Sequence, residues 1–457
     1  VFKNKLDEGF TLVKLSEEKT AYFEVKGKQK TLIIGIGKFK DITQRKSFLV
    51  VRRVIAEARK YRLKNIGIDF KDFKFKHLKI KDADLGELIG ANMTMANYEF
   101  VNFKKEPKEG WDFIEDLIVM NTNDLIAKAF KKGQIIGVEV NNCRDLANMP
   151  AGDMTPEILT EEAKLVSKGT KVNVKALDVD DMKILKMGGV LGVGQGSKNE
   201  PRFIILEYYG TKKTEKPILL VGKGVTYDTG GINLKPSQGG LLNEMHMDMA
   251  GGAAVIHTVI TASLLKIKKN VIGLVPAVEN MPSGSSYKPS DVLRSMSGQT
   301  IEVINTDAEG RIILADALTY AEKYKPKLVI DIATLTGAAI AGLGQKAMAI
   351  FTKDEKIEKK MRDLGEETGD YMWPLPLWEE YEEDIKGTFG DWANLGKIPS
   401  FAGAITAAMF LYQFAKNYPW VHLDIAPTMT TIEGQYLAKG ASGSPVKLLV
   451  KLLETFK

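Results

Sequence analysis

Two carboxylates and an arginine alternate with small residues in the segment 305–311, which reads Asn-Thr-Asp-Ala-Glu-Gly-Arg. Residues 300–304 alternate apolar and polar side chains, which predicts a strand, and residues 312–324 have apolar side chains at helical spacing. In open α/β sheets, ligands bind where a strand runs into a helix in this way. In an extended chain Asp307 and Glu309 would point the same way and could bind one or two cations. Acidic residues also favour helix N-termini, so a structural role is the alternative.

Two further segments carry charged side chains next to predicted strands. After the short apolar run 217–221, a glycine-rich stretch contains Lys223, Asp228 and Lys235, and Asp248 lies at the head of a helix of small residues. Carboxylates from these loops in one apolar crevice would repel one another and would stay ionised only beside cations. We therefore expect a metal site.

The available ligand types narrow the metal chemistry. The chain has one cysteine, Cys143, and four histidines, with neither a His-Glu-x-x-His helix nor paired cysteines, which excludes the usual histidine and thiolate zinc sites. Carboxylate-rich ligation suits two ions that activate one water molecule and stabilise a developing oxyanion. A lysine could join such a site as the neutral amine, because burial and neighbouring cations lower its pKa. A second, charged lysine would stabilise a tetrahedral intermediate.

Six ordered sequence blocks resemble the signatures of the leucyl aminopeptidase family of dinuclear metallo-exopeptidases, peptidase family M17. The likeness runs from about Asn141 to the C-terminus. The blocks are residues 221–236, 248–254, 305–311, 331–338, 402–408 and 422–426. The resemblance implies a leucyl aminopeptidase, a hydrolase that releases N-terminal amino acids from peptides with a free α-amine. It also implies a homohexamer.

The resemblance assigns roles residue by residue. It implies two divalent metal ions per subunit, Zn²⁺ and/or Mn²⁺, whose ligands would be Lys223, Asp228, Asp248, Asp307 and Glu309. Asp228 and Glu309 would bridge the two ions. Lys235 would polarise the scissile carbonyl, and Arg311 would hold a bicarbonate ion that acts as the general base.

The resemblance also implies a pocket for the first residue of the peptide. The substrate-binding positions are Lys235, Met245, Asn305, Thr334, Leu335, Gly337, Ala426 and Met429. Most are small or flexible apolar residues, so we expect leucine and other apolar residues to be preferred, with broad specificity, because such pockets separate near-isosteres by only ~1–3 kcal/mol. Core packing of both methionines is the alternative. Pro427 and Thr428 depart from the smaller residues common in the family, which affects the shape of the pocket.

Length and composition indicate an ordinary globular protein of two domains. The 457 residues exceed what a single core holds, and 44% hydrophobic with 27% charged residues is typical of globular chains. A single cysteine excludes internal disulfide bonds and fits a reducing, cytoplasmic compartment. The N-terminus has no signal-peptide pattern, and we expect no membrane span.

A lysine-rich segment near the N-terminus raises an alternative function. Residues 71–81 interleave lysines with aromatic residues, a pattern that could contact nucleic acid. Alternation instead favours a strand with Phe73 and Phe75 inward and solvated lysines outside. If the lysines do contact nucleic acid, the alternative function is a DNA-binding regulatory protein with secondary peptidase activity. A two-metal phosphoesterase is a third hypothesis, but it explains the two lysines and the arginine poorly.

The predicted elements indicate an α/β protein. We expect a smaller N-terminal α/β domain at 1–122, a linker helix at 123–150 and a larger catalytic domain at 151–457, with a mostly parallel central sheet flanked by helices. The N-terminal strands are predicted at 11–15, 31–35 and 65–69, with a helix at 47–61. The catalytic strands are predicted at 202–208, 218–221, 271–278, 300–304, 328–332 and 422–425.

Overall fold

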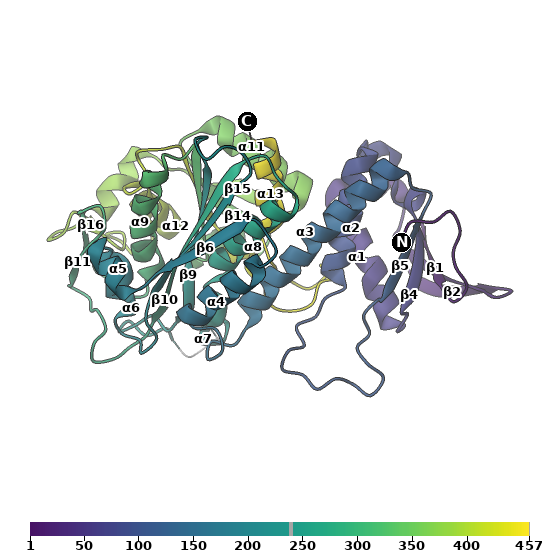
Figure 1. Cartoon of the computed structure of the whole chain (residues 1–457), viewed down its shortest axis with the longest axis horizontal. Helices are drawn as coiled ribbons and strands as arrows, with labels where there is room; N and C mark the ends of the chain where they lie inside the picture. The colour runs from purple at the N-terminus through teal and green to yellow at the C-terminus, as the bar shows by residue number, and fades with distance from the viewer. Residues whose placement is uncertain (237–240, 457) are drawn as a thin grey trace. The chain divides into compact units, whose positions relative to one another are not determined.

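The computed structural model of the protein describes residues 1–236 and 241–456, which form two compact units (Figure 1). The smaller unit comprises Val1–Asn141 and Thr431–Lys439, and the larger unit comprises Asn142–Thr430 and Gly440–Lys457. The boundary falls inside helix α3 (Asp124–Asn148). Both units are α/β, as predicted from the sequence.

The smaller unit is built on a five-stranded sheet in the order β2-β3-β1-β4-β5. Its strands are β1 (Thr11–Ser16), β2 (Ala21–Lys26), β3 (Gln29–Gly35), β4 (Asn65–Asp69) and β5 (Asp116–Met120). Only the pairing of β2 with β3 is antiparallel among these neighbours. Helices α1 (Gln44–Lys60) and α2 (Asp82–Ala96) pack together, and their apolar residues join those of the strands in one core.

The lysine-rich segment 71–81 is not a strand, contrary to the expectation. It contains two short 3₁₀ helices, η2 (Phe70–Phe73) and η3 (Lys76–Leu78). The Asp69 carboxylate accepts a hydrogen bond from the Lys71 N–H and caps η2. Lys79 has a left-handed φ of 53° that ends η3, so the backbone cannot continue as a strand. Phe73 is nevertheless buried, as expected.

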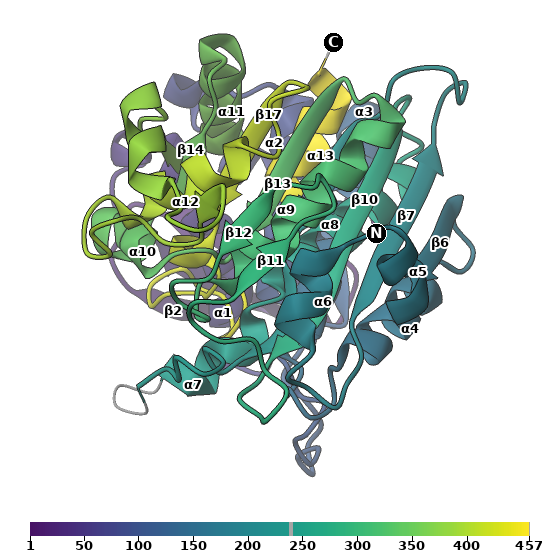
Figure 2. The same cartoon turned by 90° about the vertical axis from the view of Figure 1, so that its left-hand side faces the viewer.

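The larger unit is built on a nine-stranded sheet in the order β15-β14-β17-β13-β8-β10-β7-β6, with β9 also paired to β10 (Figure 2). The strands are β6 (Val172–Leu177), β7 (Arg202–Tyr209), β8 (Ile218–Gly222), β9 (Gly224–Asp228), β10 (Asn270–Asn280), β13 (Leu328–Ala333), β14 (Met348–Phe351), β15 (Met372–Pro374) and β17 (Trp420–Asp424). The central strands β17, β13, β8 and β10 are parallel. They are continuously buried, as strands covered on both faces must be.

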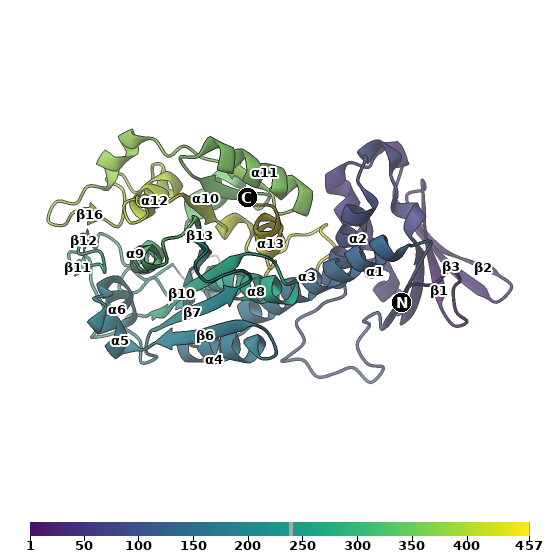
Figure 3. The same ribbon diagram turned by 45° about the horizontal axis from the view of Figure 1, so that its top comes forward.

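Helices cover both faces of this sheet, as predicted (Figure 3). Helices α4 (Pro156–Ser167), α8 (Ala250–Leu264) and α13 (Val446–Thr455) lie on one side. Helices α6 (Gly188–Gly194), α9 (Glu309–Ala321) and α12 (Gly403–Tyr412) lie on the other. Other α-helices of the unit are α5 (Val179–Ile184), α7 (Leu241–Glu244), α10 (Gly337–Leu343) and α11 (Glu355–Thr368).

The strand predicted at residues 300–304 lies outside the central sheet. It is a short strand, β12 (Thr300–Glu302), in a three-stranded sheet with β11 (Val292–Arg294) and β16 (Trp392–Ala393). Polar side chains fix this pairing, because Asp391 accepts hydrogen bonds from the backbone and hydroxyl of Thr300. The loop that leads to Asp307 and Glu309 therefore starts from this small sheet.

Helix α8 approaches the central sheet more closely than an ordinary helix can. A Cβ atom at Gly251 would lie 2.1 Å from the carbonyl oxygen of Ile332 in β13, so only glycine fits there. Among the described residues, one helical segment, Leu242–Leu264, is long and apolar enough to cross a membrane. Of its apolar window 94% is buried inside the unit, and this burial accounts for its composition.

Candidate metal centre

Loops at the ends of two strands and at the starts of two helices bring the predicted ligands together. Lys223 separates β8 from β9, and Asp228 is the last residue of β9. Asp248 lies two residues before α8, whose close contact with the sheet sets its position. Glu309 is the first residue of α9.

Lys223 is buried at the centre of one group of these side chains. Its Nζ lies 2.7 Å from Asp248 Oδ2 and 2.7 Å from Glu309 Oε1. It also donates a hydrogen bond to the carbonyl oxygen of Thr334 at 3.0 Å. The hydroxyl of Thr334 in turn donates to Asp248 Oδ1 at 2.7 Å, so Thr334 orients both members of the ion pair.

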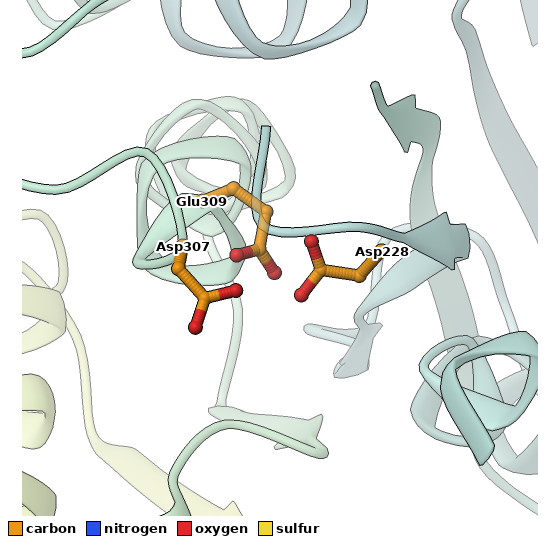
Figure 4. Close-up of side chains that lie close together, drawn as sticks. All are labelled: Asp228, Asp307 and Glu309. Atoms are coloured by element: carbon orange, nitrogen blue, oxygen red, sulfur yellow. The ribbon is translucent and has the colours of Figure 1, made fainter. Parts of the chain in front are cut away.

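Lys235 is the cation of a second, adjoining group. Its Nζ lies 2.9 Å from Asp228 Oδ2 and 2.5 Å from Asp307 Oδ1. One carboxylate oxygen from each of Asp228, Asp307 and Glu309 lies within 4.8 Å of the others, and the three carboxylates face a common space (Figure 4). The expectation that Asp307 and Glu309 lie in an extended chain is wrong. Asp307 is in a turn and Glu309 is in the first turn of α9, yet both face this space.

The concentration of negative charge shows in the pKa values of the site. Burial raises the pKa of Asp248 to about 8, against the opposing effect of Lys223. Burial, together with Asp228 and Glu309, raises the pKa of Asp307 to about 7. Burial alone would lower the pKa of both lysines, but the carboxylates outweigh it and hold both pKa values above the usual range. Lys223 is therefore charged when only side chains occupy the site.

The donor atoms fit divalent cations. Three buried oxygens, Asp248 Oδ2, Asp307 Oδ1 and Glu309 Oε1, accept no hydrogen bond from any residue that the structure describes, although each touches a lysine Nζ. Buried carboxylate oxygens without hydrogen-bond donors are costly unless cations neutralise them. Among the described residues, the group Asp228, Asp307 and Glu309 is the one found with the geometry to hold a metal ion.

Arg311 is buried in α9 two residues after Glu309. Burial lowers the pKa of its guanidinium to about 10, while Glu309 and Asp424 oppose the shift. Its Nε and Nη1 atoms have no hydrogen-bond partner among the described residues. A charged guanidinium with unused donors is suited to an anion.

Some of the predicted pocket residues lie on segments next to the predicted ligands. Asn305 Oδ1 accepts a hydrogen bond from the Asp307 N–H at 2.7 Å, and Met245 begins the short helix η4 (Met245–Met247) that precedes Asp248. Asp424 accepts hydrogen bonds from the N–H groups of Leu335 and Ala426, which brings those two segments together. The other pocket positions are Gly337 at the start of α10 and Met429 after helix η7 (Ala426–Thr428). Their contact with substrate stays a prediction.

Sequence reasoning missed the neutral side chains that hold the ligand loops. Asn280 Nδ2 donates hydrogen bonds to Asp228 Oδ1 and to the carbonyl oxygen of Thr306. Asn394 Oδ1 accepts from the N–H of Ile304, and its Nδ2 donates to the carbonyl oxygen of Asn305. The only signal in the sequence was position, since Asn280 follows a predicted strand and Asn394 lies in a polar loop segment.

Comparison with known proteins gives a consistent result. The model of the cytosol aminopeptidase family, catalytic domain, matches residues 141–450. A probable cytosol aminopeptidase of Alkalilimnicola ehrlichii is 41% identical over 432 residues, which cover 93% of this chain and 84% of that protein. One of Azotobacter vinelandii is 42% identical over 432 residues, with 93% and 85% covered.

Solved structures extend the similarity to the fold of nearly the whole chain. The bottromycin maturation enzyme BotP is 26% identical with a TM-score of 0.86, covering 97% of this chain and 98% of BotP. BotP in complex with Mn has a TM-score of 0.87 at 26% identity, covering 98% and 99%. With the family model and the curated relatives, these findings show that the chain belongs to the cytosol aminopeptidase family, peptidase family M17, and is an aminopeptidase.

Proposed function

We propose that this protein releases N-terminal amino acids, with leucine and other apolar residues preferred, from peptides at a site for two divalent metal ions. The observation that carries the proposal is the cluster of Asp228, Asp307 and Glu309, whose oxygens lie within 4.8 Å of one another. Lys223 and Asp248 adjoin this cluster through Glu309, which supports the proposal that these five side chains together hold two ions.

Bound there, Zn²⁺ or Mn²⁺ would lower the pKa of a water molecule and polarise the scissile carbonyl. The side chains supply the rest. Lys235 is partly buried, and the neighbouring carboxylates favour its charged form, so it can donate a hydrogen bond to the oxygen that becomes negative during attack. Arg311 has N–H donors without a partner among the described residues; they are suited to hold a bicarbonate ion, which would accept the proton of the attacking water.

The neighbouring segments support a preference for apolar residues. Leu335 and Ala426 are brought together by Asp424, and Met245 is next to the loop that carries Asp248. Small and flexible apolar side chains at these positions leave charged first residues without a partner, while methionine adapts to different apolar guests. We infer that leucine and methionine derivatives are hydrolysed faster than aspartate and lysine derivatives.

The test uses the full chain stripped of metal by a chelator and reloaded with Zn²⁺, Mn²⁺ or Co²⁺. We expect release of p-nitroaniline from Leu-p-nitroanilide only after reloading, and none from its N-acetylated form. Glu309→Ala should lose both metal retention and activity, because Glu309 joins the two groups of ligands. Glu380→Ala, at an exposed position, is the control and should retain both. Full activity of the chelated protein or of Glu309→Ala would refute the proposal.

We further propose that the protein acts in the cytoplasm as a homohexamer. The relatives are named cytosol aminopeptidases, and the single cysteine of this chain fits a reducing compartment. Sedimentation equilibrium of the purified protein measures the assembly directly. A mass of six chains is expected, and a monomer at all concentrations would contradict the assembly without affecting the assignment to the family.

A further inference from the structure

The buried residue Asn280 contacts two of the loops that carry the predicted metal-binding carboxylates, those of Asp228 and Asp307. It is the last residue of β10 and is fully buried. In the pairing of β10 with β9 it lies directly beside Asp228. Its pairing at the end of a central strand fixes its backbone.

The amide of Asn280 uses both of its N–H groups. Nδ2 donates to Asp228 Oδ1 at 2.8 Å and to the carbonyl oxygen of Thr306 at 2.9 Å. The reverse orientation would place Oδ1 against two acceptor oxygens, so the chemistry of the neighbours determines the orientation. Oδ1 itself has no hydrogen-bond partner among the described residues, and it packs where a Cβ at Gly231 would lie, 2.7 Å away. A buried amide oxygen without a donor lowers stability, which points to a role other than stabilising the fold.

The first contact determines which oxygen of Asp228 is available. Oδ1 accepts hydrogen bonds from Asn280 Nδ2 and from the Gly230 N–H at 2.9 Å. Oδ2 is the oxygen that contacts Lys235, whose Nζ also contacts Asp307. With Oδ1 occupied by two donors, the carboxylate cannot rotate without losing both, so Oδ2 stays directed toward the cluster.

The second contact connects the loop of Asp228 to the loop of Asp307. Thr306 precedes Asp307, and its carbonyl oxygen accepts from both Asn280 and the hydroxyl of Tyr287. The Thr306 hydroxyl donates to the carbonyl oxygen of Gly230 at 2.6 Å, and its N–H donates to Asn233 Oδ1 at 2.9 Å. Within this network the amide of Asn280 donates to a predicted metal-binding carboxylate on one side and to the neighbouring loop on the other.

We propose that Asn280 is a positioning residue of the metal centre, which sets the orientation of Asp228 and its distance from Asp307. This inference rests on the proposed function, because it assumes that these carboxylates bind metal. Asparagine suits the task because one nitrogen carries two N–H groups. Serine has a single donor, and aspartate would add a further negative charge against Asp228.

The experiment compares Asn280→Ala with a matched control at the other end of the same strand. Asn270 begins β10, is also buried, and its Nδ2 also donates to two carbonyl oxygens, those of Lys212 and Glu215. Mn²⁺ is titrated calorimetrically into the metal-stripped full chain. We expect Asn280→Ala to bind Mn²⁺ about 10- to 100-fold more weakly than the unmodified protein, in the range for residues that orient metal ligands. Asn270→Ala should lower the melting temperature but leave the Mn²⁺ affinity unchanged.

The outcomes separate this inference from the proposed function. Asn280→Ser and Asn270→Ser form a second pair should the alanine variants not fold, and serine, with one donor, should give an intermediate loss of affinity at 280 only. The positioning role would be overturned if the folded Asn280 variants bound Mn²⁺ as tightly as the unmodified protein does. It would also be overturned if the Asn270 variants lost as much Mn²⁺ affinity as the Asn280 variants. If the unmodified protein itself bound no divalent ion, the proposed function would fail first.

Discussion

Lys235 and Lys223 have similar surroundings but different predicted roles. Each Nζ touches two carboxylates, yet Lys223 also donates to the Thr334 carbonyl oxygen deep in the site, while Lys235 lies beside the more exposed Asp307. A lysine that binds metal must lose its proton, whereas a lysine that stabilises an oxyanion must keep it. Replacing Lys235 with alanine distinguishes these two roles.

Lys235→Ala should lower kcat by about 10²- to 10³-fold through lost stabilisation of the oxyanion. Metal retention should not fall, because removing this cation leaves Asp228 and Asp307 with more negative charge for a metal ion. Measurement of kcat together with metal content by mass spectrometry checks both. Lys359→Ala on the surface of α11 is the control. A parallel loss of metal and activity would show that Lys235 is a ligand instead.

The residues visible from the sequence were those with a distinctive chemistry. Asp228, Asp307 and Glu309 are charged and follow predicted strands, and the structure brings them within 4.8 Å of one another. Asn280 and Asn394 were not predicted, because a neutral amide has many uses and its partners come from loops far away in the sequence. Only the folded chain shows which amide meets which loop.

At the scale of elements, prediction succeeded where burial is continuous and failed where polar contacts decide. Strands β8, β10 and β13 are buried along their length, and their apolar runs were recognised. The prediction that residues 300–304 form a strand of the central sheet was wrong. The sequence could not reveal this, because Asp391, which accepts hydrogen bonds from Thr300, comes from a distant segment. The helical turns in 71–81 likewise depend on local capping by Asp69 that alternation does not reveal.

The close contact of α8 with β13 makes a prediction for one glycine. Gly251→Ala would place a Cβ 2.1 Å from the Ile332 carbonyl oxygen and must push α8 away from the sheet. We expect a loss of about 1–3 kcal/mol in the free energy of unfolding and weaker metal binding, because Asp248 precedes this helix. Chemical denaturation and metal titration measure the two effects.

Gly342→Ala is the matched control for this change. Gly342 lies in helix α10, and a Cβ there would meet no atom of the described residues within 4 Å. Alanine should therefore be neutral or stabilising, by roughly 0.5–1 kcal/mol. If Gly251→Ala behaved as Gly342→Ala does, the close approach of α8 would not determine the position of Asp248.

For the protein as a whole, the charges of the metal centre couple stability to pH. The pKa of Asp248 is raised to about 8 and that of Asp307 to about 7, in each case mainly by burial. A carboxyl group whose pKa is raised in the folded state stabilises the fold fully when the pH is below its pKa in the unfolded chain, near 4. This stabilisation is lost as the pH rises through the pKa of the folded state. Metal-free protein should therefore lose stability between about pH 4 and pH 8.

Metal ions should reverse this loss, since they bind the ionised carboxylates and stabilise the folded state that holds them. We expect the difference in melting temperature between Mn²⁺-saturated and metal-free protein to grow steadily from pH 5 to pH 8. Burial also raises the pKa of Asp316 to about 7. Asp316 accepts hydrogen bonds from the backbone of Val190 and Met296 and not from the predicted metal-binding group. Its effect on stability is therefore the same with and without Mn²⁺ and cancels in the difference between the two melting temperatures. Differential scanning calorimetry at four pH values is sufficient. A difference that stayed constant or narrowed would mean that Asp248 and Asp307 are already ionised without metal, and the cluster would then have no need of cations.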